Sequence, residues 1–311
     1  MEIINTDFAK IEVDFDIFEP TPTDFDGILN NVRQVLPHNL SSDDLADLIT
    51  NYGKFTLLIK QAQEVEKDNE NDDAFIFGLV AFLNLNQNYV TLENKGSILE
   101  SMKKFLIDFE NHHKNSIKGN KILFSDIFSS DNISAPKYNI GFLLDERICD
   151  IPPQISPQIF ENILSELNEN PKTYSIDGRL CDYVLCLTRV VQISSDLGEV
   201  ENDNNYNNDI KTTKTKKHKK LKRMVQRMKK STEIAWMCPE MEILFEESLI
   251  HLDIPVTIKS GTLPTDNLVD AKLLQNDNDI MNIARFFVLP FIKFEKCISH
   301  ISEIYGGNIN P

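Results

Sequence analysis

Two apolar runs, at residues 74–85 and 183–193, constrain the fold of this chain most strongly. The first is almost continuously hydrophobic, and it is too short to cross a bilayer, which takes about 20 residues in a helix. Short runs rich in Phe, Leu, Val and Ile are typical of strands inside a sheet with both faces covered. The sequence therefore predicts a central strand at 74–85 and a further strand at 183–193.

Shorter segments alternate apolar and polar residues with the period of two of a half-buried strand. Between them lie segments whose apolar residues recur at helical spacing, with capping signals such as Ser97 with Glu100. The predicted strands lie at 11–17, 55–59, 138–144 and 286–292, and the predicted helices at 26–36, 42–52, 97–109, 157–167 and 294–305; 234–252 reads as a helix and a strand. This alternation predicts an α/β fold, a single mixed sheet flanked by helices.

The composition changes abruptly after residue 195. Residues 196–209 are polar and rich in Asn, and 211–230 hold eleven Lys or Arg and no acid. Such a stretch buries too little apolar surface to order itself. We therefore expect 196–230 to be a largely disordered insertion. The α/β domain then comprises 11–195 and 231–305, with tails at 1–10 and 306–311.

The charge is divided unevenly along the chain. The net charge is −16, but without residues 211–230 the other 291 residues carry 21 bases against 48 acids, a net charge of −27. A body this negative repels nucleic acid and anionic headgroups and attracts basic proteins or cations. We expect a basic protein partner, no direct nucleic-acid binding and no membrane insertion, and we favour a monomer.

No motif in the sequence carries recognisable catalytic chemistry. The chain lacks the GxG, HExxH and GxSxG patterns, and its five cysteines form no CxxC pair. Residues 68–72 alternate acids and amides but lack the glycine and distal glutamate of a calcium loop. His112 and His113 end a polar helix, while Cys181 and Cys186 are expected as small core residues on one strand. We therefore predict no enzyme, no cofactor and no metal, with reduced thiols inside the cell.

Acidic side chains are concentrated in two places, the outer face of the first predicted strand and the loop that precedes residue 74. A basic client could bind them, or they could only keep the surface soluble. We take them as candidate partner-binding residues: Glu12, Asp14 and Asp16 on the strand, and Glu64, Glu66, Asp68, Glu70, Asp72 and Asp73 in the loop.

The basic run near residue 220 resembles a nuclear-import signal in composition. Nucleic-acid contact or a solvated linker are the other interpretations, but the run has no interleaved aromatic residues and is attached to an acidic body. Its candidate import residues are Lys216, Lys217, Lys219, Lys220, Lys222 and Arg223.

Several short segments stand in an order and spacing that resemble the BCCIP family. They are VDFD at 13–16, DFDGI at 24–28, DLADLI at 44–49, FLNL at 82–85, GFLL at 141–144 followed by Arg147, and IPPQ at 151–154. The block before residue 86 is the most specific part, and 234–285 matches only in outline.

This resemblance implies a fold like that of the GCN5-related acetyltransferases without a working cofactor loop. It also implies a nuclear protein that shuttles to the cytoplasm and acts as a non-enzymatic chaperone of a large-subunit ribosomal protein, in ribosome biogenesis and nuclear export. Two alternatives remain open: an interaction scaffold in cell-cycle control or DNA repair, and an acetyltransferase-like enzyme.

Overall fold

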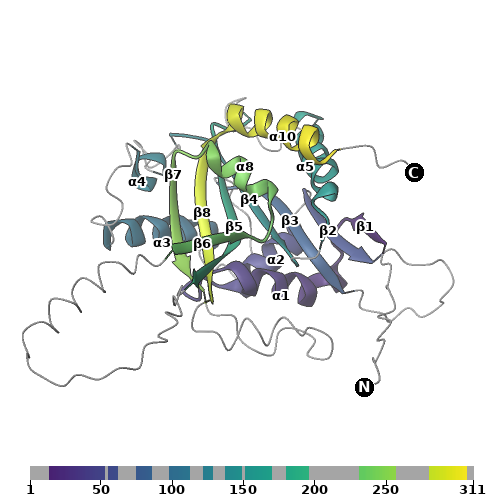
Figure 1. The fold of residues 1–311 in the computed structure, drawn as a ribbon, viewed down its shortest axis with the longest axis horizontal. Coiled ribbons are helices and arrows are strands. Elements are labelled where there is room, and N and C mark those ends of the chain that lie inside the picture. The colour runs from purple at the N-terminus through teal and green to yellow at the C-terminus, as the bar shows by residue number, and fades with distance from the viewer. Residues whose placement is uncertain are drawn as a thin grey trace, which may run out of the picture.

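One mixed sheet of eight strands organises the described part of the chain (Figure 1). The computed structural model describes residues 14–52, 55–61, 75–85, 98–112, 122–128, 137–148, 151–169, 180–195, 231–256 and 280–306. Helices cover both faces of the sheet, so the predicted α/β class is confirmed. Among the helices in these ranges, none is long and apolar enough to span a membrane.

The strands follow the order β1-β2-β3-β4-β5-β8-β7, and β6 also pairs with β5. Their bounds are β1 Phe15–Phe18, β2 Thr56–Gln61, β3 Ile76–Asn84, β4 Ile140–Arg147, β5 Tyr183–Ser195, β6 Ser231–Trp236, β7 Ile250–Pro255 and β8 Ile280–Pro290. The β4–β5 pair is parallel and every other pair is antiparallel. A parallel pair needs a crossover connection, and the helix α5, Ser156–Glu169, supplies it.

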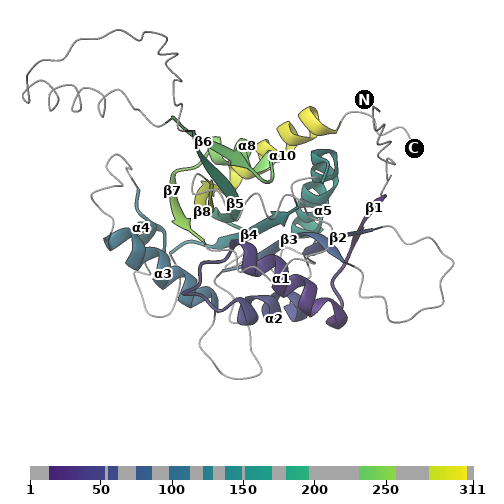
Figure 2. The same cartoon turned by 60° about the horizontal axis from the view of Figure 1, so that its bottom comes forward.

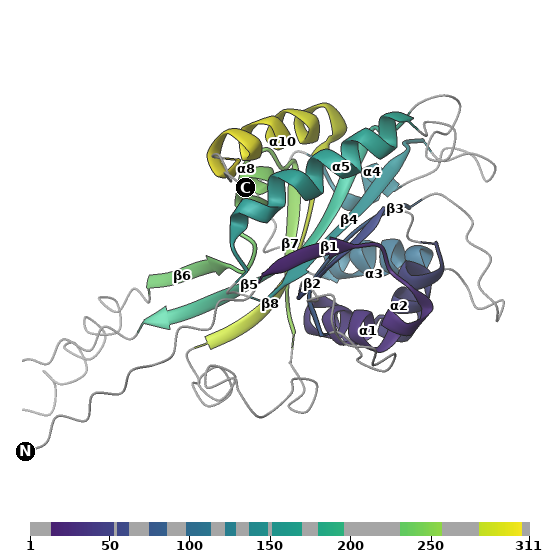
Figure 3. The same ribbon diagram turned by 90° about the vertical axis from the view of Figure 1, so that its right-hand side faces the viewer.

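The helices divide between the two faces of the sheet (Figures 2 and 3). Four pack on one face: α1 Phe25–Val35, α2 Ser42–Tyr52, α3 Ile98–His112 and α4 Phe124–Phe128. On the other face lie α5, α8 Glu240–Glu246 and α10 Phe291–Tyr305. Short 3-10 turns, η1 Pro22–Asp24 and η2 Pro153–Ile155, lead into α1 and α5.

Each face of the sheet has its own hydrophobic core. Along β4, Phe142 and Leu144 point into the first core and Leu143 into the second, as the alternation of a strand requires. Each fully buried Leu or Phe stabilises the fold by roughly 1.5–3 kcal/mol. Gly141 is needed because a Cβ atom at this position would overlap the ring of Phe82.

Two sequence predictions about strands are wrong. The last strand runs over Ile280–Pro290 and not 286–292, because Pro290 caps the following helix and Phe291 is already helical. Cys181 is not on a strand with Cys186, since β5 begins only at Tyr183. The described residues continue at Ser231 with the strand β6, where the predicted second part of the domain begins.

Other predictions fall outside the described residues. These are the start of the first strand at 11–13, the acidic loop 64–73, the insertion 196–230 and the tails, apart from Gly306.

Candidate functional site

Charged side chains are buried at the carboxyl end of β4. Asp145, Glu146 and Arg147 follow one another on this strand, and each is at most 3% exposed. Because side chains alternate along a strand, Asp145 and Arg147 point to the face of α5 and α8, and Glu146 points to the opposite face. Buried charges require partners, which the neighbouring elements supply.

Arg147 is the centre of the cluster beneath α8. Its Nε and Nη2 atoms donate to the two carboxylate oxygens of Asp145, each at 3.0 Å, and Nη1 donates to Ser156 Oγ at 2.9 Å. Nη2 also forms an ion pair with Glu240. Ser156 begins α5 and Glu240 begins α8, so Arg147 ties both helices to the sheet.

Cys238 completes the cluster from the turn between β6 and α8. Its Sγ atom donates to Asp145 Oδ1 at 3.4 Å. Burial and the charge of Asp145 raise the pKa of the Cys238 thiol well above its usual range. Burial alone would lower the pKa of Arg147, but the Asp145 charge raises it overall. The thiol therefore stays protonated beside the Asp145 carboxylate, which makes it a poor nucleophile.

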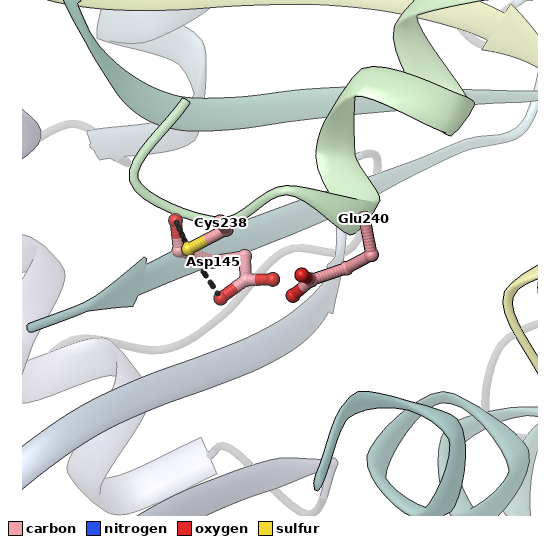
Figure 4. A group of neighbouring side chains, drawn as sticks. All are labelled: Asp145, Cys238 and Glu240. Atoms are coloured by element: carbon pink, nitrogen blue, oxygen red, sulfur yellow. Dashed lines mark hydrogen bonds between the residues drawn. The ribbon is translucent and has the colours of Figure 1, made fainter. Parts of the chain in front are cut away.

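Asp145, Cys238 and Glu240 have the spacing of a metal site (Figure 4). One ligand atom from each lies within 4.8 Å of the others, and all three residues are buried. The guanidinium of Arg147, however, already provides the positive charge for both carboxylates. A metal ion would have to displace Arg147 and deprotonate the Cys238 thiol. The donor set thus fits a buried ion cluster better than a metal centre.

A second buried pair lies on the other face of the sheet. Arg189, in the middle of β5, donates from Nε to Glu146 Oε1 at 2.9 Å, and its Nη2 atom lies 2.6 Å from the same oxygen. Burial raises the pKa of Glu146 although Arg189 acts against it. The Glu146–Arg189 pair joins β4 to β5 directly after the end of their parallel pairing, which stops at Asp145 and Thr188. Neither pair was predicted from the sequence, where the available signal is the three charged residues directly after the apolar segment 140–144.

The predicted acidic residues are only partly described. Asp14 and Asp16 are exposed beside and on β1, which lies at one edge of the sheet. Lys60 stands opposite Asp16 in the β1–β2 pairing, but its ammonium pairs with Asp24 at 2.5 Å. Burial alone would raise the pKa of Asp24, but the hydrogen bonds that its carboxylate accepts from Lys60 and Thr21 lower the pKa overall. The Asp16 carboxylate is thus left to accept a bond from the Ile17 backbone amide at 2.8 Å.

The other candidate residues lie outside the described ranges. They are Glu12, the loop acids Glu64, Glu66, Asp68, Glu70, Asp72 and Asp73, and the basic run Lys216 to Arg223.

Comparison with known proteins gives consistent matches. A bovine protein named BRCA2 and CDKN1A-interacting protein is 24% identical over 258 residues, which cover 81% of this chain and 72% of the relative. Its mouse counterpart is 27% identical over 179 residues, and the fission yeast protein bcp1 is 26% identical over 178. These two matches cover 57% and 55% of this chain, and 52% and 55% of the relatives, so the chain spans about half of their length.

A solved structure is also similar. The crystal structure of BCP1 from Saccharomyces cerevisiae superposes with a TM-score of 0.46 at 16% identity, covering 97% of this chain and 94% of that chain. The sequence model of the BCCIP family matches residues 10–244, which is well over half of the chain. The chain therefore belongs to the BCCIP family.

Proposed function

We propose that this chain is a non-enzymatic acidic escort for a basic protein client, and that the client is a protein of the large ribosomal subunit. Membership of the BCCIP family supports a role in protein interaction. The observation that carries the proposal is the charge distribution, with a net charge of −27 outside residues 211–230. A surface of this sign attracts cationic proteins over long distances.

A free ribosomal protein carries many Lys and Arg side chains that meet RNA in the ribosome. A partner that covers these side chains before assembly must offer carboxylates in place of phosphates. Asp14 and Asp16 are exposed on an edge of the sheet and can do so. The loop acids between residues 64 and 73 follow β2, the neighbour of β1, and would extend this surface.

The buried ion cluster gives no evidence for a catalytic role. Arg147 donates to Asp145 and Ser156, and the Cys238 thiol is held protonated. These groups stabilise the fold and are enclosed away from solvent. An acetyltransferase-like activity therefore has no support from this cluster.

A second candidate function is an interaction scaffold in cell-cycle control or DNA repair. The printed names of the bovine and human relatives, which refer to BRCA2 and CDKN1A, favour it. In both cases we propose a nuclear protein that shuttles to the cytoplasm, with the basic run at 216–223 as the import signal.

The escort proposal is tested by neutralising acids on β1. Asp14→Asn with Asp16→Asn is expected to slow association with a purified basic large-subunit protein by roughly threefold at low salt, because charge complementarity mainly sets the association rate. Adding amides at Glu66, Asp68, Asp72 and Asp73 is expected to deepen the loss and flatten the salt dependence. Stopped-flow binding at several salt concentrations measures both.

The matched control is Glu100→Gln with Asp108→Asn on α3, which changes the net charge equally at the far side of the sheet from β1 (Figure 1). If the wild type fails to bind any basic ribosomal protein, the escort proposal is wrong. If the control slows association as much as the β1 variant, the client surface is not at β1.

A further inference from the structure

Part of the sheet extends beyond the strand β4. The parallel pairing of β4 with β5 ends at Asp145 and Thr188, and from Val190 onward the same edge of β5 pairs with β6 instead. On its other edge, β5 pairs with β8 as far as Ile193. The strands β6, β5 and β8 therefore form an arm that projects past the helices α5 and α10 (Figure 3).

The register places apolar side chains on one face of this arm. Trp236, Val190 and Ile283 stand side by side, and the next row holds Ile234, Gln192 and Met281. Met281 is 38% exposed, and Trp236 and Ile234 are partly exposed. We call the surface formed by Ile234, Trp236, Phe245, His251 and Met281 the Trp236 face.

Aromatic contacts hold the Trp236 face in shape. The Phe245 ring, from α8, lies 5.2 Å from the Trp236 ring and 5.0 Å from the His251 ring, measured between centroids. The guanidinium of Arg285 packs against both Trp236 and Phe245, at 4.9 and 4.6 Å from their centroids. Arg285 is only 6% exposed, so it fixes the two rings from the protein side.

The positive charge of Arg285 is already neutralised. Its Nε and Nη2 atoms donate to the two oxygens of Asp253, each at 2.7 Å. Glu242 and Glu246 are exposed on α8, the helix that carries Phe245. A partly exposed tryptophan and phenylalanine with carboxylates nearby suit a partner that combines cationic and apolar side chains, because Lys and Arg are attracted to both aromatic rings and carboxylates.

We propose that the Trp236 face docks a segment of a protein partner that carries Lys or Arg beside apolar side chains. The proposal rests on the proposed escort function for the basic character of the partner. It adds a second contact surface, at a distance from the acids of β1 (Figures 1 and 2). Burial of apolar side chains on this face contributes affinity that depends little on salt. The β1 carboxylates instead raise the association rate, and this effect weakens as the salt concentration rises.

The sequence offers a direct probe of occupancy, because Trp236 is the only tryptophan of the chain. The full chain is titrated with a short peptide of Lys and Leu that contains no Trp or Tyr, and a Glu and Leu peptide serves as control. The Lys peptide is expected to change the Trp236 emission saturably, and the Glu peptide is expected not to. An equal response to both peptides, or none to either, overturns the proposal.

A pair of substitutions tests the location. Ile234→Ser with Met281→Ser is expected to weaken binding of a dye-labelled Lys peptide about tenfold, since such a surface loses much of its affinity with a few apolar contacts. The matched control is Ile292→Ser with Ile304→Ser, which removes two exposed apolar side chains of α10, 59% and 49% exposed. An equal loss in both variants overturns the location.

Further outcomes distinguish this proposal from self-association of the chain and from the escort function. An emission change that depends on protein concentration without peptide means that a second copy of the chain occupies the face, which overturns the proposal. If the β1 variant slows client association while the Ile234 and Met281 variant binds the client normally, the escort function stands and the docking face is wrong. If peptide binds at Trp236 but no ribosomal protein binds, the face stands and the escort function is wrong.

Discussion

The sheet carries two arginine–aspartate pairs on the same face, in very different surroundings. Arg147 and Asp145 lie at the end of β4, enclosed by α5 and α8, and are 3% and 0% exposed. Arg285 pairs with Asp253 on β8 and β7, where the Asp253 side chain is 33% exposed. Both arginines bind their aspartate through two nitrogens. The first pair connects helices to the sheet, whereas the second holds two aromatic rings at the surface.

The two pairs differ in what covers them. Arg147 also donates a hydrogen bond to Ser156 and forms an ion pair with Glu240. Its guanidinium is therefore not available to a partner protein. Arg285 is buried too, but the rings of Trp236 and Phe245 that pack on it are partly exposed. The two pairs therefore differ in their cover: helices enclose the Arg147–Asp145 pair, whereas partly exposed aromatic rings cover Arg285.

The largest expected effect comes from removing the enclosed arginine. Arg147→Met leaves Asp145 and Glu240 buried without a counter-charge, which costs about 3–5 kcal/mol of the free energy of unfolding. Urea unfolding followed by circular dichroism measures it. The control is Arg33→Met, because Arg33 pairs with Asp43 on the surface and is 42% exposed; there the expected cost is about 0.5 kcal/mol. Similar losses in the two variants would contradict the structural role of the cluster.

A smaller effect is expected at the second pair. Arg285→Lys keeps the positive charge but loses the two-pronged bond to Asp253 and the flat contact with both rings, at a cost of about 1–2 kcal/mol. The emission of Trp236 is also expected to change, because the residue that fixes its ring is gone. An unchanged emission spectrum with unchanged stability would show that Arg285 does not order the Trp236 face.

The smallest expected effect is a pH dependence at His251. Partial burial and the nearby charge of Arg285 lower the pKa of His251, and Asp253 only partly opposes them. Because the folded pKa lies below the unfolded value of about 6.5, this contribution to stability is present above that value. It is lost as the pH falls through the lowered folded pKa.

The contribution of His251 is well under about 1 kcal/mol, because the residue is only partly shielded from water. Comparing urea midpoints of the wild type and His251→Gln between neutral and mildly acidic pH measures it. The wild type is expected to lose slightly more stability on acidification. A larger acid loss in His251→Gln would reverse the sign and refute the assignment.

Local patterns in the sequence predicted much of the fold. Period-two alternation located the strands at 55–59 and 138–144, and apolar spacing with a proline stop located the helix that became α1. The strand β8 was placed too late because Asn282 and Arg285 interrupt its apolar pattern. Arg285 can be buried in the strand because Asp253, 32 residues earlier in the chain, pairs with it. A pattern of neighbouring residues cannot reveal a partner that distant.

The same reason limits what the sequence could say about the sites. Arg147 binds Ser156 on α5 and Glu240 on α8, and Cys238 reaches Asp145 from the turn after β6. Only the folded chain brings these residues together. Exposure of Asp14 and Asp16 followed from alternation and is confirmed. Their role as a client surface stays a prediction, as does that of the loop acids and of the basic run.

The pairing of β5 with β6 depends little on the length of the connection between the two strands. The two strands form a six-residue antiparallel ladder although 35 residues separate Ser195 from Ser231. The entropy of closing a flexible loop grows only with the logarithm of its length, so doubling the connection costs about 0.6 kcal/mol. A change in the length of this connection therefore has little effect on the free energy of forming the β5–β6 ladder.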